Sequence, residues 1–488
     1  MAKTALQEAL TRFEPVIGLE IHVQLNTKSK AYCADPTTYG AMPNTQVSPI
    51  SLGHPGTLPY VNEAVIESAV KLGIACECDI RRVNEYARKN YFYADLPKGY
   101  QITQDTTPIC NGGFVEIKDA EGKPKKIYLT RIHMEEDSGK SIHDIDPFAS
   151  LIDLNRAGVP LLEIVSEPDF ANGIEAYNYL TEMRKLVRYL DISDGNMEEG
   201  SLRCDVNISV KPIGQKEFGT KVEVKNLNSF RNVQRAIDFE IERQVADIDA
   251  GKVIIQQTKT FDAAKGETRV LRAKEDAHDY RYFPEPDLPP VILEQQYISG
   301  VKSHMPALPK ELYAKYTGFG LNDYDATLLT ESKEVALYFE DILEHTKNYK
   351  GAANFVMGPI KSYLNDKAVS ITQFEVPAKA IGQTINLIDS GAVSFSAASG
   401  ELFKALLDSP DKDPETLAKE KNLIQQSDSN ALLPFVEQAL AKYPEKVAEY
   451  RSGKKGLLGL FMGEVMKLSG GKADPKVANK LVREALEN

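Results

Sequence analysis

The chain has 488 residues, of which 42% are hydrophobic, and its 58 basic and 70 acidic side chains give a net charge of −12. This length predicts about three domains of roughly 150 residues, and the composition excludes an intrinsically disordered protein. The acidic balance excludes a uniformly basic coat for nucleic acid, although a local basic patch remains compatible with it.

The first predicted elements are strands and helices in a region from residue 15 to about residue 290. Residues 16–25 read VIGLEIHVQL and alternate apolar and polar side chains, which predicts a strand with one buried face. Apolar residues at helical spacing predict a helix over 173–190, and good N-cap residues at 228–229 predict a second that ends near residue 251. This region is therefore predicted to be α+β and rich in antiparallel sheet.

The polar faces of four predicted strands carry acidic side chains. The stretches VIGLEIHVQL, KIYLTRIHMEEDSGKS, SLRCDVNISV and GTKVEVKNLNSF share this alternation. If the strands are neighbours, one imidazole and four carboxylates gather at the strand spacing of about 5 Å, and a divalent cation would relieve their repulsion. The candidate ligands are Glu20, His22, Glu135, Asp205 and Glu223. Such an oxygen-rich set favours Mg²⁺ or Mn²⁺ over zinc, although one such strand alone is more often a solvated sheet face.

Beyond residue 290 the pattern is helical. Six prolines between positions 284 and 309 predict a domain connection, and helices are predicted over 331–349, 377–390 and 402–408, with four short ones after a turn-rich joint near residue 411. The predicted domains are residues 1–294, 295–410 and 411–488.

The last predicted domain carries a basic patch. Residues 451–483 contain eight basic side chains against two acidic ones. Such a patch suits contact with nucleic acid phosphates, whereas the plainer interpretation is a solvated helical face. The candidate binding residues are Arg451, Lys454, Lys455, Lys467, Lys472 and Lys476.

The cysteines and the hydropathy of the chain indicate the cellular compartment of the protein. The five cysteines are too few and too scattered for a disulfide framework, no apolar run reaches about 18 residues, and the amino terminus lacks a signal-peptide core. We therefore predict a cytoplasmic protein without a membrane partner.

Several unusual motifs together resemble the B subunits of bacterial tRNA-dependent amidotransferases (GatB). The strand motifs above are joined by RKNYFYADLPKGYQITQ and AHDYRYFPEPDLPP, and the likeness continues through YDATLLT, AANFVMGP and GLLGLFMGEVMKLSGGKADP. It covers nearly the whole chain after about residue 15. The resemblance implies a kinase-like catalytic cradle domain, a helical domain and a YqeY-like tail that binds tRNA.

The resemblance also implies an activity and partners. ATP and Mg²⁺ would serve to phosphorylate the side-chain carboxylate of Glu-tRNA(Gln) or Asp-tRNA(Asn), and ammonia from glutamine hydrolysis in an A subunit would displace the phosphate. A small C subunit would complete the heterotrimer. Glu135, Glu223 and Arg203 would be catalytic, and Lys89 and Lys98 would line the ammonia route. Asp153, Asn155 and Arg156 look site-like without a defined role.

One region departs from many members of that family. Where those proteins carry four zinc-binding cysteines, this chain has Cys33, Asp35, Ser48 and Ser51. A single thiolate cannot build a tetrahedral structural zinc site, so we expect no zinc.

Two other classes of function stay open on the sequence. A non-catalytic scaffold that only positions tRNA would gain nothing from pooled carboxylates, and a carboxylate–amine ligase for a small free substrate would have no use for the basic tail.

Overall fold

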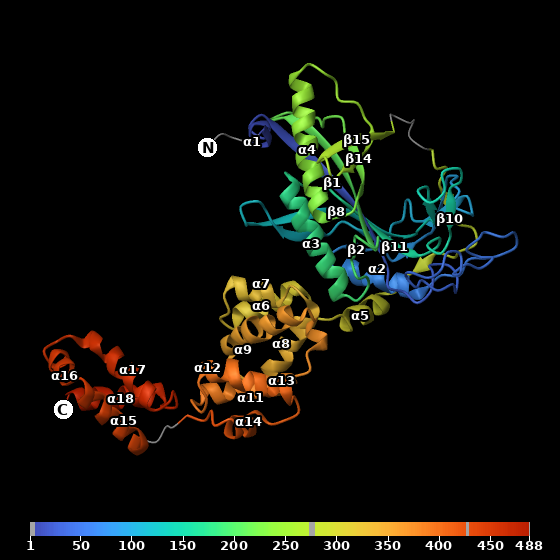
Figure 1. Cartoon of the computed structure of the whole chain (residues 1–488). Coiled ribbons are helices and arrows are strands. Elements are labelled where there is room, and N and C mark those ends of the chain that lie inside the picture. The colour runs from blue at the N-terminus through green and yellow to red at the C-terminus, as the bar shows by residue number, and fades with distance from the viewer. Residues whose placement is uncertain (1–4, 273–278, 426–428, 488) are drawn as a thin grey trace. The chain divides into compact units, whose positions relative to one another are not determined.

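A computed structural model describes residues 5–272, 279–425 and 429–487. The chain divides into two compact units, Met1–Leu308 and Pro309–Asn488. The first unit contains the sheets and the second is helical (Figure 1). The predicted α+β class is confirmed.

The centre of the first unit is a ten-stranded sheet with the order β15-β14-β13-β12-β1-β11-β8-β6-β2, and β7 pairs with β8. Its pairs are antiparallel except for the parallel pair β13 and β14. The strands are β1 Phe13–Gln24, β2 Asp79–Ile80, β6 Cys110–Asn111, β7 Phe114–Lys118, β8 Pro124–Glu136, β11 Pro160–Ser166, β12 Leu202–Pro212, β13 Val222–Leu227, β14 Thr258–Asp262 and β15 Glu267–Arg272.

The apolar face of the sheet is covered by α2 (Glu63–Ala75), α3 (Gly173–Tyr189) and α4 (Phe230–Asp249). In Figure 1, α3 and α4 run beside the sheet. In β1 the side chains of Leu19, Ile21 and Val23 are at most 1% exposed, whereas the alternate positions are partly exposed. The period-two pattern therefore sends apolar side chains to the helices and polar ones to the other face.

Side-chain caps start the two long helices where the sequence predicted them. The side chain of Asn172 accepts a hydrogen bond from the backbone N–H of Glu175 at the start of α3. Ser229 does the same for Asn232 at the start of α4. Each cap satisfies an N–H group that has no partner within its helix.

Three small sheets complete the first unit. They are β16-β4-β5, β10-β9 and β17-β3. Their bounds are β3 Val83–Asn84, β4 Ala87–Asn90, β5 Tyr100–Thr103, β9 Lys140–Ile142, β10 Leu151–Asp153, β16 Phe283–Pro284 and β17 Val291–Ile292, and the short α1 spans Ala5–Ala9.

The proline-rich segment belongs to the first unit, so the predicted boundary at 294/295 lies inside it. Arg88 of β4 forms ion pairs of 2.7 Å with Glu285 and 3.0 Å with Asp287. The helix α5 (Gln295–Ser303) then packs against α2. The contacts of this segment therefore move the division of the chain to Leu308.

The second unit is helical throughout its described residues. Its α-helices are α6 Pro309–Gly318, α7 Asp323–Leu329, α8 Lys333–His345, α9 Tyr349–Phe355, α10 Lys361–Lys367, α11 Ala378–Asp389, α12 Phe395–Ala397, α13 Phe403–Asp408, α14 Pro414–Glu420, α15 Ser429–Lys442, α16 Pro444–Arg451, α17 Leu458–Leu468 and α18 Pro475–Glu487. No described helix in either unit is both long and apolar enough to cross a membrane.

The helices α11 and α13 agree with the predictions for 377–390 and 402–408, but the predicted helix 331–349 ends early. Thr346 has an extended backbone after His345, and the side chain of Asn348 caps α9 by accepting a hydrogen bond from the N–H of Gly351. Among the described residues from 411 onward there are five α-helices, where four were predicted. The last helices share an apolar cluster that includes Leu432, Phe461 and Val482, and the predicted division at 410/411 stays a prediction.

We predict that Glu240→Gln destabilises the first unit. Glu240 of α4 is fully buried, and its carboxylate pairs with Lys259 of β14 at 3.0 Å and with Arg243 at 2.7 Å. Removing its charge leaves the buried ammonium of Lys259 without an anionic partner, although Arg243 keeps Asp247 at 2.8 Å, and the loss costs about 3 kcal/mol. Urea unfolding measures the loss. The control is Asp249→Asn on the same helix, whose exposed pair with Arg12 should contribute little, and equal midpoints for the two variants would contradict the prediction.

Candidate functional site

The polar face of the main sheet carries a row of charged side chains from four strands. Arg203 of β12 is the cross-strand partner of His22 in β1, His22 is paired with Glu163 of β11, and Glu163 is paired with His133 of β8. The predicted strands thus share one sheet, but β11 lies between β1 and β8. This insertion places Glu163 at the centre of the row.

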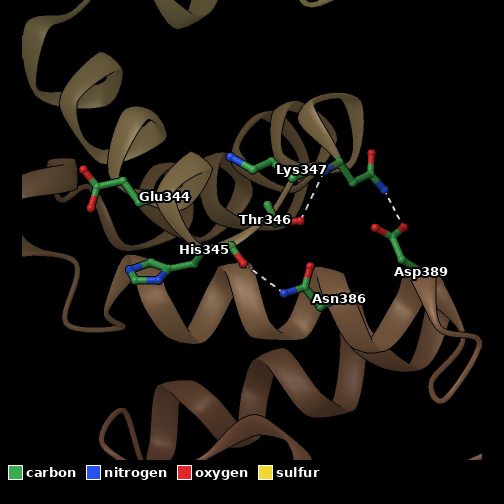
Figure 2. Close-up of a pocket in the computed structure, with 7 residues that line it drawn as sticks. Glu344, His345, Thr346, Lys347, Asn386 and Asp389 are labelled. Atoms are coloured by element: carbon green, nitrogen blue, oxygen red, sulfur yellow. Dashed lines mark hydrogen bonds between the residues drawn. The ribbon is translucent and has the colours of Figure 1, made fainter.

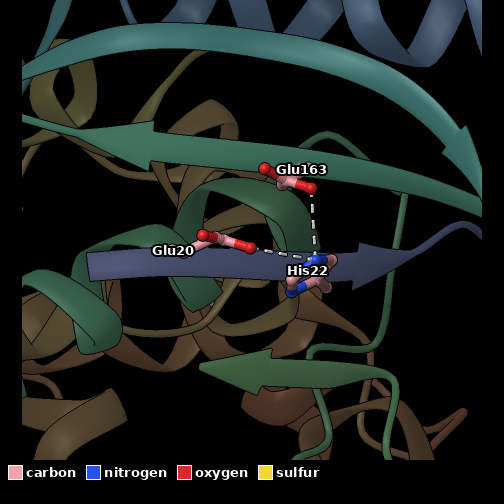
Figure 3. Close-up of side chains that lie close together, drawn as sticks. All are labelled: Glu20, His22 and Glu163. Atoms are coloured by element: carbon pink, nitrogen blue, oxygen red, sulfur yellow. Dashed lines mark ion pairs between the residues drawn. The ribbon is translucent and has the colours of Figure 1, made fainter. Parts of the chain in front are cut away.

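The carboxylate of Glu163 lies between two imidazoles. Its Oε2 atom is 3.3 Å from Nε2 of His22 and 3.5 Å from Nε2 of His133. Oε1 of Glu20 is 3.6 Å from the His22 ring, and Oε2 of Glu135 is 3.6 Å from the His133 ring. Figure 3 shows Glu20 and His22 on one strand and Glu163 on its neighbour. We call these five residues the carboxylate–imidazole cluster.

Opposite charges in the cluster offset the cost of burial for His133 and Glu163 but not for Glu20. Burial lowers the pKa of His133, but Glu163 and Glu135 outweigh this effect and raise it to about 9. Burial raises the pKa of Glu163, whereas His133 and His22 bring it well below the usual value. Burial and the charge of Glu163 raise the pKa of Glu20. Glu163 and the two imidazoles therefore favour one another's charged forms.

Within the cluster two overlapping triads have donor atoms close enough to hold a metal ion. They are Glu20, His22 and Glu163, and His133, Glu135 and Glu163, each with all donor atoms within 4.8 Å of one another. Their oxygen and imidazole donors fit Mg²⁺ or Mn²⁺. Glu20, His22 and Glu135 from the predicted set therefore lie together.

Asp205 and Glu223, the other predicted ligands, belong to neither triad and are paired with Lys225. Lys225 places its ammonium 2.7 Å from Asp205 and 3.0 Å from Glu223. The Thr258 hydroxyl also donates to Glu223 at 3.0 Å. Asp205 faces Glu20 across the strand pair, whereas Glu223 lies one strand further out, so the sheet spreads the predicted set over several strands.

Arg203 is held by an acidic partner. It donates a hydrogen bond of 2.6 Å to Asp137, which also accepts one of 2.9 Å from Gln24. Burial lowers the pKa of Arg203, but Asp137 outweighs this effect and raises it. The Nε atom of Arg203 is buried without a hydrogen-bond partner among the described residues.

The two lysines expected on one ammonia route line different cavities. Lys89 lines a cavity of about 360 Å³ with Tyr91 and Tyr280. Lys98 lines one of about 210 Å³ with Tyr32 and donates a hydrogen bond to Glu136. Burial lowers the pKa of Lys89, but Glu135 and Glu163 outweigh this effect and raise it.

The residues without an assigned role, Asp153, Asn155 and Arg156, hold neighbouring loops in place. Asn155 accepts a hydrogen bond from the N–H of Gln46 at 2.8 Å and donates one to the carbonyl of Met42 at 2.7 Å. Asp153 accepts one from the N–H of Asn44, and Arg156 donates to the carbonyls of Ser138 and Gly139. Each therefore has structural partners within the first unit.

Hydrogen bonds join the segment that contains Cys33 and Asp35 to the segment that contains Ser48 and Ser51. Oδ2 of Asp35 accepts hydrogen bonds from the Ser51 hydroxyl at 2.6 Å and from the N–H of Ser48 at 2.9 Å. Burial raises the pKa of Asp35, but the donors Ser51, Cys33 and Ser48 outweigh this effect and lower it. This network connects two loop segments.

The basic residues of the tail lie on its surface, and some already have partners. Lys454 pairs with Glu449 at 3.0 Å, Arg451 donates to the carbonyl of Leu486, and Lys455 lies over the Tyr450 ring. Lys467 and Lys476 are exposed, and Lys472 is partly exposed. The patch therefore presents cations to solvent, as its composition predicted.

A further polar cavity lies in the helical unit. It has a volume of about 580 Å³ and is lined by residues that include Glu344, His345, Asn348 and Asp389 (Figure 2). Asn348 donates to Asp389, and Asn386 donates to the His345 carbonyl. Asp341, which lies 3.8 Å from the His345 ring, is 57% exposed. These hydrogen bonds join the helices that meet at the cavity. None of the contacts indicates a buried charged site.

Sequence reasoning missed Glu163 and left His133 out of the metal set. Residues 160–166 read PLLEIVS, in which a single carboxylate stands among apolar residues. A lone glutamate in a buried strand needs a partner of opposite charge or a hydrogen-bond donor, so the sequence motif could have marked Glu163 as a candidate site residue. Its partners could not be named, because they depend on which strands are neighbours.

The first unit matches the family model described as the GatB/GatE catalytic domain over residues 15–299, and residues 337–486 match the model described as the GatB domain. The chain belongs to the GatB family. The second match begins well before residue 411, inside the helical segment.

Full-length relatives support the same family assignment. Proteins named as the B subunit of aspartyl/glutamyl-tRNA(Asn/Gln) amidotransferase are 47% identical in Salinibacter ruber and 49% identical in Gloeothece citriformis, and each comparison covers 98% of both chains. One from Pelodictyon phaeoclathratiforme is 48% identical over 98% of this chain and 100% of its own.

We predict that Asp35→Asn lowers the free energy of unfolding by about 1 kcal/mol at pH 7, because two donors lose a charged acceptor. The pKa of Asp35 is lower in the folded state than its usual value of 3.8, so its contribution is present above that value and is lost as the pH falls through the folded-state pKa. The difference from the unmodified chain should persist from pH 7 to 5 and shrink towards pH 3 in urea unfolding. A difference that stays constant over this range would contradict the prediction, and exposed Asp144→Asn is the control.

Proposed function

We propose that this chain is the B subunit of a tRNA-dependent amidotransferase and that it activates the side-chain carboxylate of misacylated Glu-tRNA(Gln), Asp-tRNA(Asn) or both, using ATP and Mg²⁺. The observation that carries the proposal is the carboxylate–imidazole cluster, in which Glu163 lies between two imidazoles on a buried sheet face. The names of the relatives, which mention aspartyl- and glutamyl-tRNA, support the substrate class.

The chemistry explains the need for such a site. A side-chain carboxylate is a poor electrophile, because its leaving group would be oxide. Transfer of the γ-phosphoryl group of ATP gives an acyl phosphate, from which ammonia displaces phosphate to form the amide. Two anions must approach each other in the first step, so positive groups fixed near the reacting oxygens lower the barrier.

The cluster has the donors for the metal that this chemistry uses. Glu20, His22, His133, Glu135 and Glu163 would hold Mg²⁺, or Mn²⁺ in its place. The ion would supply positive charge to the phosphate oxygens. No zinc is part of the proposal.

Cationic side chains next to the cluster would position the phosphates. Arg203 has a free Nε donor and lies in the same row as His22, and Lys225 holds Asp205 and Glu223 in fixed positions. We assign Arg203 to phosphate contact, and Glu135 and Glu223 to the catalytic set.

The chain would depend on partners for ammonia. We propose that an A subunit hydrolyses glutamine and that a small C subunit completes the heterotrimer. Ammonia would reach the acyl phosphate past Lys98 and Lys89, whose cavities lie beside Glu136 and Glu135. The five cysteines form no disulfide, which agrees with a cytoplasmic complex.

We predict that Glu163→Gln reduces tRNA-dependent phosphate release from ATP at least 100-fold in the reconstituted complex, because the two triads lose their shared charged donor. Mn²⁺ binding, measured by calorimetry, should weaken more than tenfold. Glutamine hydrolysis in the partner should survive.

Glu135→Gln and Glu223→Gln should also abolish phosphate release. The control is Glu217→Gln, which removes an exposed carboxylate. Normal activation of charged tRNA by Glu163→Gln and Glu135→Gln would rule out the cluster as the phosphoryl-transfer site and favour a scaffold role.

We also propose that the basic tail binds tRNA phosphates. Replacing Lys467, Lys472 and Lys476 together with Gln should weaken tRNA binding and reduce the slope of log affinity against log salt by about 2 to 3, which is roughly 0.7 to 0.9 per phosphate contact. Filter binding over a salt series measures both quantities. The control replaces the exposed Lys361, Lys367 and Lys404 outside the tail. An unchanged slope in the tail variant would contradict the assignment.

A further inference from the structure

A cavity of about 360 Å³ in the first unit contains one side chain of each charge. It is lined by Lys89, Tyr91, Tyr93, Asp95, Gln101 and Tyr280. Polar groups in such a small space, next to aromatic walls, are typical of a site that orients a small ligand.

One wall of this cavity is bonded directly to the carboxylate–imidazole cluster. The side-chain amide of Gln101 donates a hydrogen bond of 3.0 Å to Oε1 of Glu135 and one of 2.7 Å to the carbonyl of Glu136. The Tyr91 hydroxyl donates to the amide oxygen of Gln101. A ligand in the cavity therefore lies beside the cluster.

The ammonium of Lys89 has no anionic partner in contact. Among the residues that the structure describes, it makes no hydrogen bond and no ion pair within 4.0 Å, and its contact is the Tyr280 ring at 5.1 Å. A partly buried ammonium loses hydration, so it gains from a carboxylate that enters the cavity. Lys89 thus offers a site for an anionic group.

One oxygen of the Asp95 carboxylate accepts no hydrogen bond from the described residues. Oδ2 accepts a hydrogen bond of 3.0 Å from the Ser141 hydroxyl, and Oδ1 has no partner within the described ranges. The backbone carbonyl of Asp95 accepts one of 2.8 Å from the N–H of Gly139, which fixes the residue in place. Asp95 thus offers a site for a cationic group.

The reacting end of a misacylated tRNA carries both matching charges. Its glutamyl or aspartyl group has an α-ammonium next to the ester and a carboxylate at the end of its side chain. We propose that this cavity holds the aminoacyl group of the charged tRNA, with Asp95 binding the α-ammonium and Lys89 binding the side-chain carboxylate beside the cluster.

This assignment rests on the proposed function and extends it to the substrate. With the carboxylate at Lys89, its oxygens lie next to Glu135 and the other members of the cluster, where phosphoryl transfer would take place. Lys89 then stands where the ammonia route ends, because ammonia must meet the same carbon. Lys89 also gives a reason for selectivity, since it would bind the side-chain carboxylate that distinguishes the acidic aminoacyl groups, whereas the α-ammonium at Asp95 is common to all aminoacyl groups.

The first test pairs Asp95→Asn with removal of the α-charge from the ligand. Equilibrium binding to the complete complex is measured without ATP, using Glu-tRNA(Gln) and its N-acetylated form. The unmodified complex should bind the acetylated form about 10- to 100-fold more weakly. In Asp95→Asn this ratio should fall towards one, because the same interaction is already lost.

The second test pairs Lys89→Gln with removal of the side-chain charge. The unmodified complex should bind Glu-tRNA(Gln) about tenfold or more tightly than Gln-tRNA(Gln), and Lys89→Gln should lose this preference. Affinity for uncharged tRNA should stay unchanged in both variants, which shows that they are folded. Asp144→Asn, an exposed carboxylate in the 143–150 loop, is the control and should keep both ratios.

The proposal is overturned if acetylation weakens binding by the same factor in Asp95→Asn as in the unmodified complex, or if Lys89→Gln keeps its preference for Glu-tRNA(Gln). Both tests omit ATP, so an error in the phosphoryl-transfer assignment would leave their result intact. Conversely, phosphate release that depends on Glu163 would survive the failure of this proposal.

Discussion

The structure of the first unit depends on the need to neutralise anions on a buried sheet face. Glu135, Glu163 and His133 are each at most 5% exposed, and charges so far from water are costly without partners. Glu163 meets this requirement by lying between His22 and His133. The same donor atoms are those with which we propose that the site holds a divalent cation.

This arrangement requires an accurate strand register. A shift of one residue would turn the polar side chains of a strand towards the helices and its apolar ones towards the cluster. The helices α3 and α4 prevent such a shift, because they cover the apolar face, where Ile21 and Val206 are fully buried. The packing of one face therefore fixes the chemistry of the other.

Some polar and charged groups around the cluster already have a hydrogen-bond or ion-pair partner, and others do not. Asp205 and Glu223 share the ammonium of Lys225, and Asp35 is bonded to two serines. The ammonium of Lys89 lacks an anionic contact, and Arg203 has a buried donor without a partner among the described residues. The open groups are those to which we assign substrate and phosphate, because a buried polar group without a partner is stabilised when a ligand binds.

The sequence by itself determined the α+β class, the helices from Gly173 and Phe230, and the polar faces that hold Glu20, His22 and Glu135, because alternation and N-caps are local signals. Only the tertiary structure decided that β11 lies between β1 and β8, which made Glu163 the centre of the cluster and left Glu223 outside it. It also extended the first unit to Leu308. Strand order and domain boundaries depend on contacts between residues far apart in the chain, and such contacts leave no periodic signal in the sequence.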